Sequence, residues 1–511
     1  MKMCLLLSLC AACLLVALGQ GCANRNPQLL AGSHAIDVTP EVLPAIRNGG
    51  FLQQVWDKVL DPLYARCFVL QSGDEILAIA VVDSCMIPRD VCNEAKELVH
   101  QQTGIPVDRI LIASTHTHSA PSVMDMCLGT NSDPNYEAFL PPRVAAGIVA
   151  AYENLEPAQL GWTVVDAPDH THCRRWLKHP DHYSEDPFGE KTVRAMMHPG
   201  YQNPDYIGEA GPVDSGLSLL SIRSADGSRP IGLLANYSMH YFGAGGGFSA
   251  DYYGKFNELL EERIGSDDSE EAAFVVAMSQ GTSGDLHWMD YSKPKKENYT
   301  IDQYSEELAE IAYNAYQEID YKNVVGGISM DETTILLNRR LAGKDRIAWA
   351  EQMNAQRGDR RPENRPEVYA EQVTWFLENP QEELILQTIA IGDLGITAMP
   401  NEVYGITGLK LKAQSPFSMT FNIELANGAA GYIPPPEQHY LGGYTTWPAR
   451  TAGLELNAEP VIVDTLLGML EGISGQKRKA LITDFYNDQQ RAAINQAKAD
   501  DNNRANRGLD R

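Results

Sequence analysis

The chain has 511 residues, 44% of them hydrophobic, and a formal net charge of −26 at pH 7. A surface this acidic repels phosphate backbones and anionic lipid headgroups, which argues against nucleic-acid binding and against docking on an anionic membrane. The apolar content is sufficient for a substantial core. The five cysteines beyond position 22 are scattered, odd in number and without a CxxC pair, so they indicate neither a disulfide framework nor a cysteine zinc site.

Residues 1–21 have the pattern of a secretory signal peptide. Lys2 precedes an apolar run (3–18), and small residues follow at the expected cleavage position. The run is too short to predict a membrane span. We therefore expect an exported protein, whether periplasmic, secreted or lipid-anchored at the cell surface. Ala17-x-Gly19 suits an ordinary signal peptidase, whereas Cys22 after Gly21 leaves a lipid anchor open.

A loosely recurring unit follows along the chain, with two apolar strands around a Gly/Asp turn, a helical pattern and a third apolar strand. The three copies span 65–119, 216–285 and 384–432, with turns at Gly73-Asp74, Asp226-Gly227 and Gly392-Asp393. Near-continuous apolar strands indicate sheets covered on both faces. The pattern predicts an α/β fold of mixed β-sheets covered by helices, in a single domain over 30–475, with the active site at the strand ends.

Three segments lie outside this repeating pattern. Residues 166–212 are polar and hold five of the twelve histidines, and a segment of this length without clear periodicity is typical of a functional or mobile insert. Residues 338–378 predict a second insert of two charged helices. Residues 476–511 form a polar tail, for which we expect a solvated helix followed by disorder.

Side chains that could bind a metal or move protons gather at the strand ends. They are Asp83, His116, His118, His240, Asp285, His287, Glu402 and Tyr432. Residues two apart on an extended backbone project to the same side, so His116 and His118 can face one site. Each position also has an ordinary interpretation: a histidine can cap a strand or be hydrogen-bonded in the core, Glu402 can favour a helix N-terminus, and Tyr432 can be a half-buried tyrosine.

Four segments together resemble the neutral/alkaline, non-lysosomal ceramidase family, over about 33–470. They are AIDVTP (35–40), STHTHSAP (114–121), the Pro-x-Glu of MPNE (399–402) and AGYIPPPEQHYLGGY (430–444). The resemblance implies a single Zn²⁺ held by His116, His240, Glu402 and Tyr432. It also implies catalytic roles beside the metal for His118, Tyr444 and Arg174, with Arg175 as the adjacent alternative to Arg174.

The sequence departs from the family pattern in two places. Where ceramidases have Gly-Asp-x-Ser-Pro, this chain has Gly284-Asp285-Leu286-His287-Trp288, so the serine sometimes given a catalytic role is replaced. The 67 residues after Tyr444 are too few and too polar for the C-terminal β-sandwich of ceramidases. The first departure excludes a serine-nucleophile mechanism, whereas the missing C-terminal module and the 166–212 insert favour a substrate that differs from ceramide.

We therefore expect a zinc-dependent hydrolase in which metal-activated water cleaves an N-acyl amide, of a ceramide-like lipid or another N-acylated compound. A metal-dependent esterase or deacetylase on an exported carbohydrate or small molecule is the alternative. A non-catalytic metal-binding protein is a third interpretation. The metal donors would also suit iron or manganese. The sequence gives no sign of an obligate protein partner.

Overall fold

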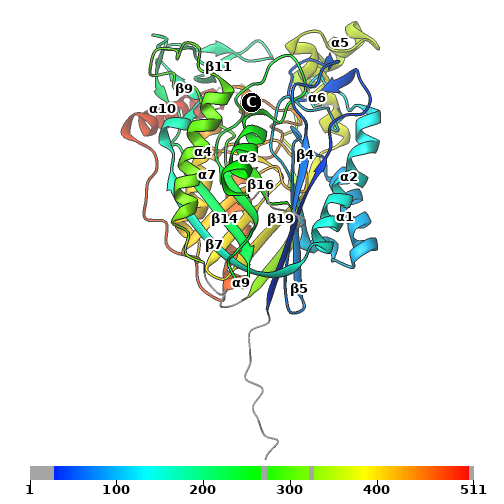
Figure 1. Ribbon diagram of the computed structural model, residues 1–511. Helices are drawn as coiled ribbons and strands as arrows, with labels where there is room; N and C mark the ends of the chain where they lie inside the picture. Colours follow the sequence, from blue (N-terminus) through cyan, green and yellow to red (C-terminus); the bar gives the residue numbers. More distant parts are fainter. Residues whose placement is uncertain (1–27, 126, 266–272, 322–326, 506–511) are drawn as a thin grey trace, which may run out of the picture.

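The computed structural model describes residues 28–125, 127–265, 273–321 and 327–505 (Figure 1). The predicted signal peptide and Cys22 lie outside these residues. The chain forms mixed β-sheets whose outer faces are covered by helices, which confirms the predicted fold class. Among the described helices, none has both the length and the apolar character needed to cross a bilayer.

The three predicted repeats are three copies of one structural unit. The first consists of β4 (Tyr64–Ser72), β5 (Glu75–Val82), α1 (Arg89–Thr103) and β6 (Ile110–Ser114). The second consists of β14 (Gly216–Ser224), β15 (Pro230–Tyr237), α3 (Asp251–Ile264) and β16 (Val275–Gln280). The third consists of β19 (Gln381–Ile391), β20 (Leu394–Ala398), α7 (Gly405–Gln414) and β22 (Met419–Ile423). In every copy the first two strands are antiparallel and the last two are parallel.

Tight glycine turns connect the first two strands of each unit. Gly73, Gly227 and Gly392 have φ angles of 63°, 77° and 56°. Side chains other than glycine rarely adopt this left-handed conformation, so the Gly/Asp pairs in the sequence mark the hairpins for a steric reason. The parallel partner strand needs a crossover, and α1, α3 and α7 supply it.

The units combine into two main sheets. The eight-stranded sheet has the order β16-β15-β14-β7-β1-β4-β5-β6, in which β1 (Leu29–Asp37) and β7 (Glu156–Asp166) connect the first two units. Only two residue pairs join β1 to β7, so the sheet consists of two halves held by a short junction. The third unit and β18 (Ile328–Asn338) form a four-stranded sheet.

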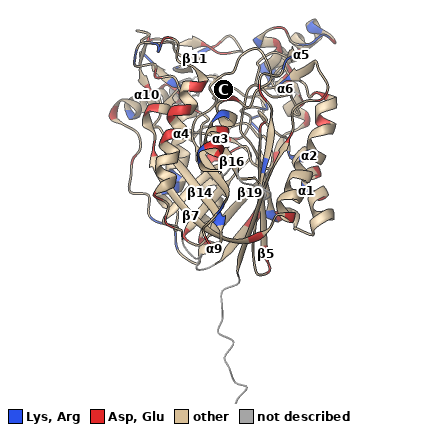
Figure 2. Cartoon of the chain, viewed as in Figure 1, with Lys and Arg blue, Asp and Glu red and all other residues tan. Residues whose placement is uncertain are grey.

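One apolar core lies between the inner faces of all three units. It includes Phe68, Leu111, Leu234, Ile396 and Phe421, each at most 1% exposed. The outer faces pack under α1 and α2 (Pro134–Glu153), under α3 and α4 (Ile301–Gln317), and under α7 and α9 (Ala458–Ser474). Burial on both faces explains the near-continuous apolar strands. Acidic side chains are spread over the outer helices and loops (Figure 2).

The segments outside the repeats gather at one end of the molecule, at the top in Figure 1. The 166–212 segment contains the short strands β8 (His172–Cys173), β9 (Arg175–Lys178), β10 (Ser184–Glu185), β11 (Lys191–Val193), β12 (Ala195–Met197) and β13 (Tyr206–Glu209). The second insert contains α5 (Lys344–Arg357) and α6 (Arg365–Glu378). The remaining short elements are β2 (Ala45–Arg47), β3 (Gln54–Trp56), β17 (Leu286–His287), β21 (Glu402–Val403), β23 (Tyr432–Ile433), α8 (Pro436–His439) and the 3₁₀ turns Val107–Arg109, Pro168–His170 and Tyr444–Thr446.

The polar tail contains α10 (Asp488–Ala505), which is packed rather than solvated on one side. Ile494 and Ala497 are buried against Leu177, Ala195 and Leu441. Apart from Ile494, the apolar residues of this helix are all alanines, which give a weak periodic signal, so the sequence suggested solvation where the structure has a docked helix.

Candidate metal centre

The ends of strands from all three units meet at one place. The backbone N–H of Ser114, at the end of β6, donates to the Leu425 carbonyl (3.2 Å), and that of Glu424 donates to the carbonyl of Gln280, at the end of β16 (3.1 Å). These bonds tie the ends of β6, β16 and β22 together. His116 follows β6, His240 follows β15, and Glu402 begins β21 shortly after β20.

Three donor groups converge at this junction. The Nε2 atoms of His116 and His240 are 3.1 Å apart. The Glu402 Oε2 atom lies 3.3 Å from the first nitrogen and 3.9 Å from the second. Two donors that each lie about 2.1 Å from a tetrahedral ion are about 3.4 Å apart, so the observed spacings match one shared divalent cation. All three residues are buried.

The hydrogen bonds around His116 direct its lone pair into the centre. Its Nδ1 is 2.7 Å from the Cys85 carbonyl oxygen, which can only accept, so Nδ1 carries a proton, and in the neutral ring the lone pair is then on Nε2. The residue has a φ of 71°, which is uncommon for a histidine and typical of functional sites. Burial lowers the pKa of His240 well below its usual value, which favours the neutral form that binds metals.

Glu402 and Tyr432 stand opposite each other on the paired strands β21 and β23. The Glu402 Oε2 atom is buried and has no hydrogen-bond partner among the described residues. A buried carboxylate oxygen without a donor costs free energy, and a cation between it and the two imidazoles would remove that cost. The donor set therefore fits a metal ion such as Zn²⁺.

Arg174 links the other groups of the centre. Its Nη2 donates to the Tyr432 hydroxyl (3.1 Å) and to the Gly284 carbonyl oxygen (2.8 Å), and it lies 3.4 Å from His240 Nδ1. The alternative, Arg175, is directed elsewhere: its guanidinium donates to Gln438 and to the Ala195 carbonyl oxygen. The structure thus brings Arg174 to the centre and not Arg175.

His118 and Tyr444 border the centre. His118 Nε2 is 3.1 Å from His116 Nε2, and its ring stacks on Tyr241 with centroids 3.9 Å apart. The Tyr444 ring lies 5.6 Å from the Tyr432 ring. Burial raises the pKa of Tyr444 well above its usual value, so the phenol stays protonated and can donate a hydrogen bond.

Cys85 is a neighbour that sequence reasoning did not single out. With His116 and His118 it forms a second group of candidate donors, and its Sγ is 3.8 Å from His116 Nδ1. Burial raises the pKa of this thiol well above its usual value, and a protonated thiol is a poor metal ligand. Its carbonyl group, which orients His116, is the part of Cys85 that contributes to the centre.

The remaining strand-end residues have other roles. Asp83 forms a buried ion pair with Arg66 (2.7 Å), away from the centre. Asp285 accepts a hydrogen bond from the Gly405 backbone N–H (2.8 Å) and so fixes the start of α7. His287 is buried against His198, with ring centroids 5.2 Å apart.

A cavity of about 290 Å³ opens onto this candidate metal centre. His116, His240, Glu402 and Tyr432 contribute to its wall together with His118, Arg174 and Tyr444. All seven residues predicted from the sequence as ligands or catalytic groups therefore border one cavity. Their individual roles stay predictions, because coordination and catalysis need a bound metal and a substrate.

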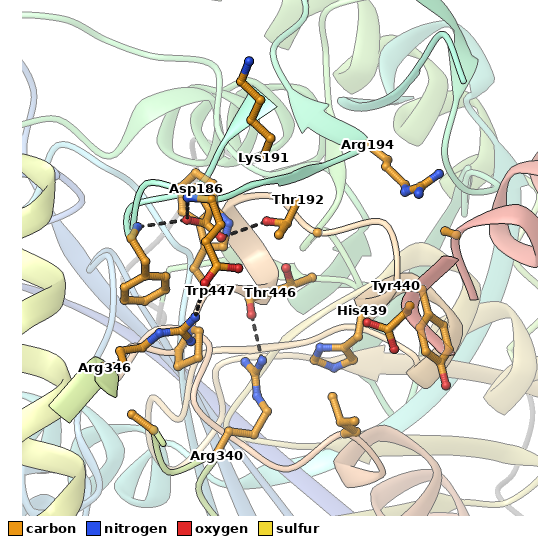
Figure 3. Close-up of a pocket in the computed structure, with 18 of the residues that line it drawn as sticks. Asp186, Lys191, Thr192, Arg194, Arg340, Arg346, His439, Tyr440, Thr446 and Trp447 are labelled. Carbon is orange, nitrogen blue, oxygen red and sulfur yellow. Dashed lines mark hydrogen bonds and ion pairs between the residues drawn. The ribbon is translucent and has the colours of Figure 1, made fainter. Parts of the chain in front are cut away.

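A second cavity, about 410 Å³, is lined in part by the loop that carries Tyr444, through Thr446 and Trp447 (Figure 3). Residues of the 166–212 and 338–378 segments and of α10 line it, and Arg340 donates to the Thr446 carbonyl oxygen (2.8 Å). Its charged groups include ion pairs within the wall, Arg194–Asp500 and Arg346–Glu190. Neither group of candidate metal donors in the described chain lies in this wall, so the smaller cavity is the candidate active site.

Comparison with known proteins identifies the fold. No family model matches the sequence, and no curated protein matches it. Among solved structures, neutral ceramidase from Pseudomonas aeruginosa is similar with a TM-score of 0.64 and 16% identity, over 90% of this chain and 77% of that one. A ceramidase complexed with C2 gives a TM-score of 0.65 and 15% identity, over 90% and 78%. The resemblance predicted from four short motifs is thus confirmed at the level of the fold.

Proposed function

We propose that this protein is a zinc-dependent hydrolase of the neutral ceramidase type that cleaves an N-acyl amide. The observation that carries the proposal is the convergence of two imidazoles, a carboxylate and a phenol beside a cavity, in a chain with the ceramidase fold. Fold alone does not specify a reaction, so the argument rests on the site.

His116, His240, Glu402 and Tyr432 would hold the ion. When bound, a divalent ion such as Zn²⁺ supplies Lewis acidity and lowers the pKa of water toward neutrality. The pairing of Tyr432 with Glu402 and the hydrogen bond from Arg174 support this role for Tyr432. Burial and the nearby Glu402 raise the pKa of Tyr432. The Arg174 cation acts in the opposite direction and lowers it.

Three side chains of the wall would act on the substrate. A carbonyl oxygen that becomes negative as water attacks needs hydrogen-bond donors, and Tyr444 and His118 border the cavity where it would lie. Arg174 adds a buried positive charge. Either Tyr444 or His118 would pass a proton to the departing amine. Burial lowers the pKa of His118 well below its usual value, so its ring is neutral before the reaction.

We further propose that the protein works outside the cytoplasm, as its N-terminal sequence predicts, with lipid attachment at Cys22 still open. A lipid or small-molecule N-acyl substrate would meet it there. The cavity near the metal centre is about 290 Å³, which suits one acyl group of moderate length better than a macromolecule.

A panel of fluorogenic acyl amides and acyl esters, assayed with and without chelator, tests the proposal. We expect amide hydrolysis that chelation removes and Zn²⁺ restores. Faster turnover of esters, or of acetylated carbohydrates, would favour the esterase or deacetylase alternative. A protein that binds Zn²⁺ yet hydrolyses nothing on the panel would support the non-catalytic interpretation. Exposed His182 (52% side-chain exposure) provides a control variant, His182→Ala, which should behave as the wild type.

A further inference from the structure

The second cavity, about 410 Å³ in volume, collects the segments that lie outside the repeating units. The 166–212 segment, the 338–378 segment, α10 and the loop that follows Tyr444 each contribute to its wall. Charged residues of both signs line it: Lys191, Arg194, Arg340, Arg346, Asp186, Glu190, Asp500 and Asp501. The partners of these charges decide whether the wall is complete or lacks a ligand.

Three of the acidic groups are engaged within the wall itself. Asp186 accepts three hydrogen bonds from its own loop, two from backbone N–H groups and one from a threonine hydroxyl. Glu190 pairs with Arg346 (3.8 Å), and Asp500 pairs with Arg194. The wall therefore uses these acids to hold its own segments together.

Arg340 is a cation without an acidic partner. Its guanidinium donates to the carbonyl oxygens of Thr446 (2.8 Å), Leu454 (2.9 Å) and Ala452, and no carboxylate of the described residues forms an ion pair with it. A guanidinium has five N–H donors, so these three bonds leave donors for a ligand. Burial and the nearby Arg346 lower the pKa of Arg340 to about 10. A partly buried cation that lacks a counter-ion favours the binding of an anion.

Arg346 supplies a second guanidinium beside the first. Figure 3 shows the side chains of Arg340 and Arg346 directed toward the same part of the cavity, whereas Lys191 extends away from them. The Arg346 guanidinium lies over the Phe188 ring, 3.9 Å from its centroid, which fixes its plane. Its separation of 3.8 Å from Glu190 is too long for a hydrogen bond, so the N–H donors of Arg346 are also unused.

The rest of the wall determines the kind of anion that fits. Apolar side chains line much of it: Phe188, Leu341, Val373, Phe376 and Leu456. They suit an apolar body attached to the charged group. A second negative charge would be repelled by the acidic residues of the same wall. A carboxylate, which carries one charge and matches the fork of a guanidinium, is therefore favoured over a phosphate group.

We propose that the second cavity is a binding site for a small carboxylate with an apolar body, held by Arg340 and Arg346. This inference goes beyond the proposed function and does not depend on it, because neither group of candidate metal donors in the described chain lies in this wall. Trp447 lines both cavities, and Arg340 donates to the Thr446 carbonyl oxygen. A bound carboxylate would thus lie one hydrogen bond away from the loop that carries Tyr444.

Two probes with the same chain separate the charge from the apolar contacts. Octanoate carries the carboxylate, and octanamide is its neutral match. Calorimetry on the full-length protein gives a dissociation constant for each probe. We expect the wild type to bind octanoate about tenfold more tightly than octanamide. Arg346→Gln should abolish this preference, whereas Arg361→Gln, at an exposed position of the same segment, should keep it. Arg346 is the better position to change, because Arg340 also holds the backbone of the Tyr444 loop.

A third variant separates this cavity from the candidate metal centre, where a carboxylate could also bind. His240→Ala removes one of the candidate metal donors and should leave the preference for octanoate unchanged. Equal affinity for the two probes in the wild type, or a preference that survives Arg346→Gln, would overturn the inference. Loss of the preference in His240→Ala would do the same, because it would place the carboxylate at the metal centre. Inorganic phosphate that binds more tightly than octanoate would contradict the proposed ligand class.

Discussion

Replacing Tyr444 by phenylalanine removes one hydroxyl group and leaves the packing of the ring. The ring lies 5.6 Å from Tyr432 and 6.4 Å from Trp447, and phenylalanine retains both contacts. Burial keeps the phenol protonated. The variant should therefore fold and bind metal as the wild type does, and lose only the hydrogen-bond donor of a residue that lines the cavity.

The expected effect is a loss of turnover and not of substrate affinity. Removal of one donor that stabilises a developing oxyanion typically lowers kcat by about 100- to 1,000-fold, or about 2.7–4 kcal/mol. Steady-state kinetics on the amide that the wild type hydrolyses best, with metal content measured on the same samples, give the values of kcat and KM. A fall confined to kcat agrees with an interaction made only in the transition state.

Two results would refute this reasoning about Tyr444. Unchanged kcat at full metal occupancy would remove Tyr444 from the catalytic groups. A rise in KM with kcat unchanged would assign it to substrate binding in the ground state. A matched change in the same cluster, Tyr369→Phe, alters a buried tyrosine that does not border the cavity, so it should leave kcat unchanged.

Three further predictions concern stability. Burial raises the pKa of Asp285 to about 6, so its stabilising contribution is complete below about pH 4 and is lost as the pH rises through 6. Asp285→Asn, which keeps an acceptor for Gly405, should gain about 3 kcal/mol relative to the wild type between pH 4 and 7 in urea unfolding, and a pH-independent difference would contradict this. Arg340→Met removes the donors to the carbonyl oxygens of Thr446, Ala452 and Leu454. It should lower the free energy of unfolding by about 3–5 kcal/mol in the same assay. A loss below about 1 kcal/mol would show that these hydrogen bonds contribute little to stability. Zn²⁺ at about 1,000 times its Kd should stabilise the chelated protein by about 4 kcal/mol, and His240→Ala should abolish this increment if His240 is a ligand.

The repeating units could be predicted from the sequence because their signals are local. Apolar runs, glycine turns and helical periodicity recur three times, and each copy forms the expected strands and crossover helix. The assembly of the units could not be predicted in this way. The two-pair junction between β1 and β7 depends on long-range packing and leaves little trace in composition.

The residues of the candidate site could be predicted from the sequence, but the contacts between them could not. Strand ends and four motifs indicated His116, His240, Glu402 and Tyr432, and these residues border one cavity. The role of the Cys85 carbonyl has no sequence signature, because any residue can supply a backbone oxygen. The choice between Arg174 and Arg175 also required coordinates, since the two adjacent guanidinium groups point to different partners.

The 166–212 segment shows the same limit of prediction from the sequence. Its length without clear periodicity predicted a functional or mobile insert, but only the structure separates His198 in the cavity wall from exposed His182. The tail was expected to be solvated, and instead α10 packs against the same segment through Ile494 and Ala497. Sparse apolar residues are a weak signal until their partners are known.

The central claim is that one cation is held by two imidazoles, a carboxylate and a phenolic oxygen. Elemental analysis of the purified protein, combined with anomalous X-ray scattering from its crystals, tests it most directly. We predict one equivalent of Zn²⁺ and a single anomalous peak bounded by His116, His240, Glu402 and Tyr432. A metal peak elsewhere, or an active enzyme with less than stoichiometric metal after chelation, would contradict the account.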